Sequence, residues 1–182
     1  MEKTLTDEQL MEAVRGGELN KASQLFDRYH KHLYNFFVKI TLDRDLGHDL
    51  TQNVFMRMIH YKHTYQTGAV FKSWIFRIAR NIYADHYRKN KVMFSDDNLE
   101  IMDQKMTAVD DQMVEDERQK LLYIALYKLK PEQKEILILS KFQKLKYEEI
   151  ASIYETSVGA IKTKVHRALG QLKENYLELE KI

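Results

Sequence analysis

The stretch EIASIYETSVGAI, residues 149–161, decides the fold of the carboxy-terminal part of this 182-residue chain. Its apolar residues follow the three- and four-residue spacing of two helices joined by a short turn. Ala151 is small where the second helix crosses the first, and Thr156-Ser157 provides an N-cap for the second helix. Four side chains supply the apolar contact between the helices: Ile150, Ile153, Val158 and Ile161. The pattern is typical of a helix-turn-helix.

The second of these helices, predicted from about Ser157 to Leu177, has an outward face suited to duplex DNA. No acidic residue occurs between Ser157 and Lys173. A small, neutral-to-basic face near a helix N-terminus fits the major groove, although a charged stripe can also be an ordinary solvated face. The absence of acids and the preceding turn favour DNA recognition. The candidate DNA-binding residues are Ser157, Ala160, Lys162, Thr163, Lys164, His166 and Arg167.

The rest of the sequence predicts an all-α protein. The chain contains only one Pro and six Gly, which are the residues that break helices, and no stretch alternates apolar and polar residues as a strand would. Thr6-Asp7-Glu8-Gln9 has the form of a capping box and opens a short helix that ends at Gly16-Gly17. Further helices are expected at about residues 20–40, 45–59, 71–91, 121–129 and 147–154, and one more that starts at Pro131 and continues through 135–142. A polar and aromatic loop, residues 60–70, precedes the helix at 71–91.

The charge is distributed in three blocks that the net charge of +2 conceals. Residues 1–94 carry 15 basic and 10 acidic groups, residues 95–117 carry 1 and 9, and residues 118–182 carry 13 and 8. Two basic blocks separated by an acidic strip suggest two polyanion-binding modules on a linker. We therefore expect two small helical domains, 1–94 and 113–182, joined by a flexible acidic linker over 95–112 that lets them act far apart.

The helix predicted at 71–91 interleaves cations with aromatic rings, which is the chemistry that single-stranded DNA requires. Phosphates need positive charge, and unpaired bases need flat apolar surfaces. Trp74 and Phe76 are expected to be core residues, so the loop residues Tyr61 and Tyr65 are the better stacking candidates. The candidate residues for this surface are Tyr65, Lys72, Trp74, Arg77, Arg80, Asn81 and Arg88.

Several functional classes receive no support from the sequence. Zero Cys excludes disulfides, thiolate zinc sites and Cys nucleophiles. Asp45 and Asp49 lack a partnered nucleophile, and His60 with His63 is more simply a pair of loop histidines than a metal site. Apolar runs such as residues 136–139 are far shorter than the roughly 18 residues of a membrane span. We predict no catalytic residues, metal, cofactor or small-molecule substrate, and a soluble protein without a signal segment.

Three stretches together resemble the extracytoplasmic-function (ECF) group of sigma factors in the sigma-70 family, which are two-domain specificity subunits of bacterial RNA polymerase. They are residues 49–55 (DLTQNVF), residues 71–81 (FKSWIFRIARN) and the block from 130 to 168. The resemblance follows the family's order and covers nearly the whole chain. It implies a cytoplasmic transcription initiation factor, not an enzyme, that selects promoters and helps to melt them.

The resemblance also implies a partner for each module. The helix around 49–55 would dock on the beta-prime clamp helices of core polymerase through Asp49, Leu50, Gln52, Asn53 and Phe55. The minus-ten promoter element would meet the 71–91 helix and the loop before it, and the minus-thirty-five element would meet the helix-turn-helix. Further implied partners are the polymerase beta flap and an anti-sigma factor. The linker would thread towards positively charged channels of the polymerase.

Four residues depart from the family pattern. Asn53 stands where Glu is usual, Lys146 replaces a capping Ser or Thr, Ala160 replaces a common Thr, and Glu155 occupies a turn position often held by Gly or Asn. Promoter preference is therefore expected to differ. Two other functions are compatible with the residues alone: a conventional helix-turn-helix repressor or activator, and a helical adaptor without a nucleic-acid role.

Overall fold

The computed structural model describes residues 4–90 and 117–181, and every regular element within those ranges is helical. The first half contains α1 (Asp7–Arg15), α2 (Ala22–Thr41), α3 (Arg44–His60) and α4 (Phe71–Lys89), with short 3-10 turns at Leu19–Lys21 and Lys62–Thr64. The second half contains α6 (Glu117–Tyr127), α7 (Pro131–Leu137), α8 (Tyr147–Tyr154) and α9 (Val158–Leu179), with a π-helical turn, η4 (Ile138–Phe142), after α7. The all-α prediction is confirmed. The predicted linker, 95–112, lies outside the described residues.

Side-chain caps start three of these helices. The Thr6 hydroxyl accepts from the Gln9 backbone N–H, and the Gln9 side chain accepts in return from the Thr6 N–H, which completes the predicted capping box. Asp43 accepts from the Leu46 N–H at the start of α3. Ser157 accepts from the Ala160 N–H at the start of α9, as predicted.

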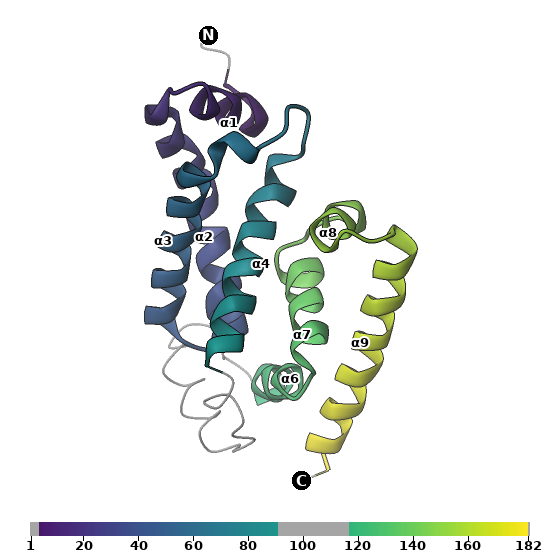
Figure 1. Ribbon diagram of the computed structural model, residues 1–182. Helices are drawn as coiled ribbons and strands as arrows, with labels where there is room; N and C mark the ends of the chain where they lie inside the picture. Colours follow the sequence, from purple (N-terminus) through teal and green to yellow (C-terminus); the bar gives the residue numbers. More distant parts are fainter. Residues whose placement is uncertain (1–3, 91–116, 182) are drawn as a thin grey trace.

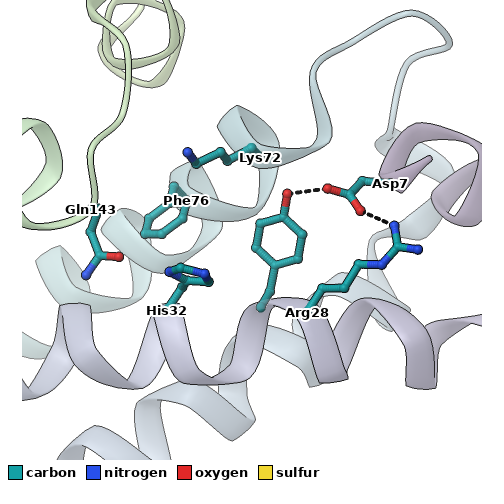
Figure 2. A pocket seen from close by; sticks show the side chains of 7 residues that line it. Asp7, Arg28, His32, Lys72, Phe76 and Gln143 are labelled. Atoms are coloured by element: carbon teal, nitrogen blue, oxygen red, sulfur yellow. Dashed lines mark hydrogen bonds and ion pairs between the residues drawn. The ribbon is translucent and has the colours of Figure 1, made fainter.

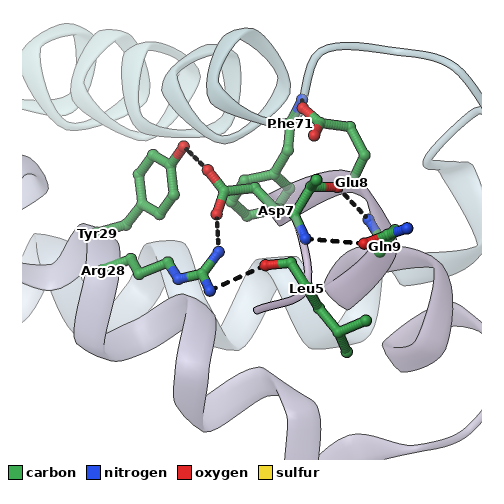
Figure 3. Close-up of polar contacts among 8 residues, drawn as sticks. Leu5, Asp7, Glu8, Gln9, Arg28, Tyr29 and Phe71 are labelled. Carbon is green, nitrogen blue, oxygen red and sulfur yellow. Dashed lines mark hydrogen bonds and ion pairs between the residues drawn. The ribbon is translucent and has the colours of Figure 1, made fainter. Parts of the chain in front are cut away.

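Helix α1 ties the first half together through two acidic residues (Figure 3). Asp7 accepts from the Arg28 guanidinium at 2.6 Å and from the Tyr29 hydroxyl at 2.5 Å, both on α2. Burial and the neighbouring Asp7 carboxylate raise the pKa of Tyr29, so its hydroxyl stays a donor. Glu8 accepts at 3.2 Å from the backbone N–H of Phe71, the first residue of α4, where a negative charge also favours the helix dipole. The start of α4 is thereby held by α1.

A close contact between α2 and α3 depends on Gly47. A methyl group added at Gly47 would lie 2.7 Å from Cγ2 of Val38, a branched side chain with little freedom to move away. The glycine therefore lets the two helices approach, and the core beside them is filled by apolar residues from α2, α3 and α4: Leu33, Phe36, Phe37, Val54, Met58, Ile75 and Phe76.

In the second half, α8 and α9 form the predicted helix-turn-helix. Three of the four predicted contact residues, Ile150, Ile153 and Ile161, are buried, and Val158 is partly buried against them. Glu155 adopts the left-handed conformation that ends α8, with a φ of 52°. Lys146 cannot cap α8 with its side chain. Its backbone N–H donates to the Glu149 carboxylate at 2.7 Å, so this donor at the helix start has a partner within α8 itself.

The two halves lie against each other (Figure 1). Helix α4 packs on α8, α2 packs on the π-helical turn η4, and buried apolar residues of both halves form one continuous cluster. Among residues 4–90 and 117–181, no helix combines the length and the apolar character that crossing a bilayer requires.

Replacing Gly47 by Ala tests the α2–α3 contact. Although Ala favours a helix over Gly, the clash with Val38 should dominate and lower the free energy of unfolding by about 1 to 2 kcal/mol in urea titrations. The matched control is Gly170→Ala on α9, where an added methyl meets open space and should raise stability by up to about 1 kcal/mol. A stabilising Gly47→Ala would contradict the close approach.

Candidate nucleic-acid interface

The outward face of α9 presents the predicted minus-thirty-five residues to solvent. Lys162, Thr163, His166 and Arg167 are exposed, while Ile161, Val165 and Ala168 on the opposite side are buried against the rest of the second half. Ser157 is exposed and caps the helix, and Ala160 is half-buried. Its small side chain leaves room at the helix N-terminus for close approach of a duplex.

Lys164 differs from its neighbours, because its ammonium group forms an ion pair with Glu132 at the start of α7. The same group lies 5.7 Å from the centre of the Tyr154 ring. Lys164 therefore also fastens α9 to α7 and α8, a role that the sequence pattern did not indicate.

On α4, the predicted minus-ten residues lie around the part of the helix that faces away from the core. Asn81 is exposed, Lys72, Trp74, Arg77 and Arg80 are half-buried, and the core side of the helix is formed by Ile75, Ala79 and Ile82. Arg88, in the last turn, is exposed and pairs with Asp85 at 2.9 Å.

A cleft of about 610 Å³ lies between this face of α4, the preceding loop and α8. Trp74, Arg77 and Asn81 line it from α4, together with Tyr61 from the loop. The opposite side is formed by Glu148, Glu149 and Ser152 of α8. Aromatic, amide and guanidinium groups in one cleft are suited to holding an unpaired base by stacking and hydrogen bonds.

The structure does not support Tyr65 as a stacking residue. Its side chain is 1% exposed and packs between Phe71 and Trp74, and its hydroxyl donates to the Ala69 carbonyl oxygen. Burial raises the pKa of this hydroxyl to about 12. Tyr65 closes the loop onto α4, whereas Tyr61, the other tyrosine of the predicted pair, is 46% exposed and lines the cleft.

A second, smaller polar pocket of about 220 Å³ lies next to Lys72 (Figure 2). Phe76 reaches it from α4, His32 from α2, and Gln143 from the segment after η4 in the second half. Its wall also contains the Asp7–Arg28–Tyr29 cluster, in which the Asp7 carboxylate is already engaged. Lys72 thus lies where the two halves meet.

The predicted docking residues on α3 fall into two groups. Asp49 and Gln52 are exposed and Asn53 is half-buried, so their polar groups are accessible. Leu50 is buried in the core, with 6% of its surface exposed. Phe55 is 9% exposed and packs against Phe26, with 4.8 Å between the centres of the two rings. Leu50 therefore contributes packing in this conformation. Two exposed apolar side chains also lie on this part of the surface, and the sequence pattern did not indicate them. They are Met56, which is 72% exposed, and Phe26, which is 42% exposed.

A buried polar cluster joins α4 to the second half. Arg80 Nε lies 3.2 Å from Glu135 Oε1 of α7, and its guanidinium lies 4.3 Å from the centre of the Tyr154 ring of α8. Among the described residues, Glu135 Oε1 and the Tyr154 hydroxyl find no well-aligned hydrogen-bond partner. Burial therefore outweighs the attraction of Arg80 and raises the pKa of Glu135 to about 7.

Comparison with known proteins identifies both halves. Residues 25–92 match the family described as Sigma-70 region 2, and residues 119–172 match Sigma-70, region 4. The ECF RNA polymerase sigma factor SigM of Bacillus subtilis is 32% identical over 155 residues, which cover 84% of this chain and 93% of SigM. SigX of the same organism is 29% identical over 158 residues, which cover 83% and 81% of the two chains.

Two solved structures share the fold. The structure of CnrH in complex with the cytosolic domain of CnrY has a TM-score of 0.70 at 20% identity and covers 92% of this chain and 95% of that one. The sigma factor RpoE, in complex with the anti-sigma factor NepR from Bartonella quintana, has a TM-score of 0.65 at 24% identity, with coverages of 84% and 94%.

The raised pKa of Glu135 predicts a pH dependence of stability. Because its pKa rises from 4.5 to about 7 on packing, the neutral carboxyl is favoured in the packed chain, and stability is lost as the pH rises from about 4.5 through 7. The Glu135→Gln side chain stays neutral at every pH. From pH 5 to pH 8, the variant's free energy of unfolding should therefore rise by about 1 to 3 kcal/mol relative to that of the parent protein. Urea unfolding at both pH values measures the difference.

The control is Glu178→Gln, which replaces an exposed acid on α9. Its free energy of unfolding should equal that of the parent protein at both pH values. A Glu135→Gln variant whose stability relative to the parent protein is the same at pH 5 and pH 8 would show that the carboxyl of Glu135 is not desolvated.

Proposed function

Because the chain belongs to the ECF group of the sigma-70 family, we propose that it binds core RNA polymerase, directs it to promoters with two recognition elements, and assists their melting. The observation that carries the proposal is the pair of surfaces on α4 and α9, which combine the chemistry of single-stranded and duplex DNA binding within the two matched family regions. In this role the protein acts without chemistry of its own and works in the bacterial cytoplasm, where the polymerase is.

We assign the segments of the chain to the parts of this task. Residues 1–94 form the docking and minus-ten module, 95–112 the linker and 113–182 the minus-thirty-five module. Asp49, Gln52 and Asn53 offer polar contacts to the beta-prime clamp helices, and exposed Met56 adds apolar area beside them. The second half meets the beta flap. An anti-sigma factor is a further expected partner, since the sigma factor RpoE was solved with one.

Melting follows from a difference in affinity. A cleft that holds an unpaired base better than duplex DNA shifts the opening equilibrium towards the melted promoter. The cost is a few kcal/mol of unstacking for each extruded base. Asn81 is the side chain best placed to bind such a base, because its amide is exposed at the cleft and offers both a donor and an acceptor.

The experiment that tests the proposal as a whole is reconstitution with bacterial core polymerase. The full chain should co-purify with core polymerase and direct it to a defined set of start sites on genomic DNA, identified by sequencing the transcript ends. A protein that binds duplex DNA tightly without polymerase, and leaves the start sites unchanged, would instead be a conventional regulator.

Asn81→Ala should impair promoter opening more than polymerase binding, because the amide contacts DNA only after melting begins. Permanganate footprinting measures the opening, and a core-binding assay measures the affinity for polymerase. An equal loss in both measurements would refute the assignment of Asn81.

Arg167→Ala should weaken recognition of the minus-thirty-five element, by about 1 to 3 kcal/mol if the guanidinium contacts a base edge with two hydrogen bonds. The control is Lys173→Ala, which removes an exposed cation further along the same helix. Run-off transcription from promoters that differ only in the upstream element gives the readout, and unchanged selectivity in Arg167→Ala would count against a base contact.

A further inference from the structure

We propose that α1 takes part in minus-ten recognition, because it positions Gln66, a loop residue suited to contact an unpaired base. The loop segment 65–71 leads into α4, and Arg15 and Glu8 of α1 hold its two ends. The inference rests on the proposed function, since it takes the cleft beside α4 to be the place where the melted strand binds. It adds to that function a helix that lies before residues 25–92, the part matched by Sigma-70 region 2.

Gln66 lines the cleft from the loop, as Asn81 does from α4. Its side chain is exposed, and its amide offers both a donor and an acceptor, which suits the edge of an unpaired base. The backbone of Gln66 belongs to a tight turn, in which the Ala69 N–H donates to the Gln66 carbonyl oxygen at 3.0 Å. Gly68 in this turn has a φ of 82°, which a residue without a Cβ adopts at no steric cost. The turn gives this part of the loop one defined backbone path.

Arg15, in the last turn of α1, holds the start of the segment. Its guanidinium donates at 3.0 Å to the backbone carbonyl oxygen of Tyr65. That oxygen belongs to the peptide group that joins Tyr65 to Gln66. Because a peptide group is planar, a bond that fixes its oxygen also fixes the direction in which the backbone enters Gln66. Hydrogen bonds from a charged donor are roughly twice as strong as neutral ones, which suits this contact to holding a loop.

Glu8 holds the other end of the segment. Its Oε1 accepts at 3.2 Å from the backbone N–H of Phe71, where α4 begins. Arg15 follows Glu8 at a spacing of about two helical turns, so both residues lie on the same side of α1. One side of α1 therefore contacts both ends of the segment that carries Gln66.

Helix α1 is itself fixed to the core of the first half. Its three apolar core residues are fully buried: Leu10, Met11 and Val14. Asp7 adds the two hydrogen bonds to α2 that Figure 3 shows. Arg15, by contrast, is exposed, so its side chain supplies the hydrogen bond to the loop and little packing. Removing this side chain should therefore disturb the loop without unfolding the helix.

Placement of Gln66 matters because a polar group binds a base only within a narrow range of geometry. Functional groups have to be held within about 0.5 Å of the productive position. A loop that loses its attachment to α1 spreads Gln66 over several positions, and only a fraction of the molecules then present it correctly. The affinity for the unpaired base falls by that fraction, whereas docking on polymerase through α3 is unaffected.

The test uses holoenzyme reconstituted from the full chain and core polymerase, on a promoter mapped with the parent protein. Arg15→Ala removes the hydrogen bond, and the matched control is Lys31→Ala, which removes an exposed cation of α2. Permanganate footprinting measures the equilibrium constant for promoter opening, a core-binding assay measures docking, and urea unfolding checks that each variant is folded in the assay. Gln66→Ala and the double variant Arg15→Ala/Gln66→Ala complete a double-mutant cycle.

We expect Arg15→Ala to lower the opening constant about five- to tenfold relative to Lys31→Ala, as the net loss of one hydrogen bond would. The two variants should bind core polymerase equally well. The double variant should open the promoter as well as the weaker of its two single variants, because Arg15 acts through Gln66. The salt dependence of promoter binding should stay unchanged, since a residue that touches no phosphate releases no counterion.

Three results would overturn the proposal. Additive losses in the cycle would show that Arg15 does not act through Gln66. A salt dependence whose slope is smaller by about 1 in Arg15→Ala would show that Arg15 contacts a phosphate itself. Normal opening by Arg15→Ala or by Gln66→Ala would show that the loop position is not used to bind the base.

Asn81→Ala in the same assay separates these failures from failure of the proposed function. If Asn81→Ala loses promoter opening while Arg15→Ala keeps it, only the role of α1 is wrong. If Asn81→Ala, Arg15→Ala and Gln66→Ala all open the promoter as the parent protein does, the cleft is not the site of the unpaired base, and the assignment of the melting surface fails as well.

Discussion

The packing of the two halves is constrained by Arg80 and Glu135, whose facing polar atoms are buried where the halves meet. A partly buried guanidinium is unfavourable without a polar partner, and the carboxyl group of Glu135 of α7 lies 3.2 Å from it. The ring of Tyr154 covers the guanidinium from α8. Yet the same burial disfavours the charged form of Glu135, so the contact that joins the halves is close to balance and not strongly favourable.

Helix α4 meets competing demands because it carries the core on one side and the cations on the other. Its core side is fixed by Ile75, Ala79 and Ile82, and its first backbone N–H is held by Glu8 of α1. The orientation of the cationic side therefore follows from the packing of the first half alone. Acids of α7 and α8 meet this side, and the contact proposed with DNA phosphates would not require α4 to refold.

Local chemistry was sufficient to predict the helices and two of their caps, since Thr6 and Ser157 act within three residues of their own positions. It failed where tertiary packing decides. Tyr65 lies in a loop, where no periodicity separates a buried ring from an exposed one, and the loop folds it inward. Leu50 was a docking candidate by resemblance, although its four-residue spacing from Val54 already placed it on the buried side of α3. The pairing of Arg77 with Glu155 joins residues 78 apart, which no local pattern reveals.

The different surroundings of the two faces that we propose bind DNA also bear on how such a protein can diverge. Lys162, His166 and Arg167 are exposed, so substitutions there should cost little in folding. Lys72, Arg77 and Arg80 each have a partner on the second half, and a change at one of them disturbs a contact with α7 or α8 as well as the contact proposed with DNA. If the two faces read the promoter as proposed, new upstream specificities need only single substitutions, whereas new downstream specificities need compensating changes in two helices.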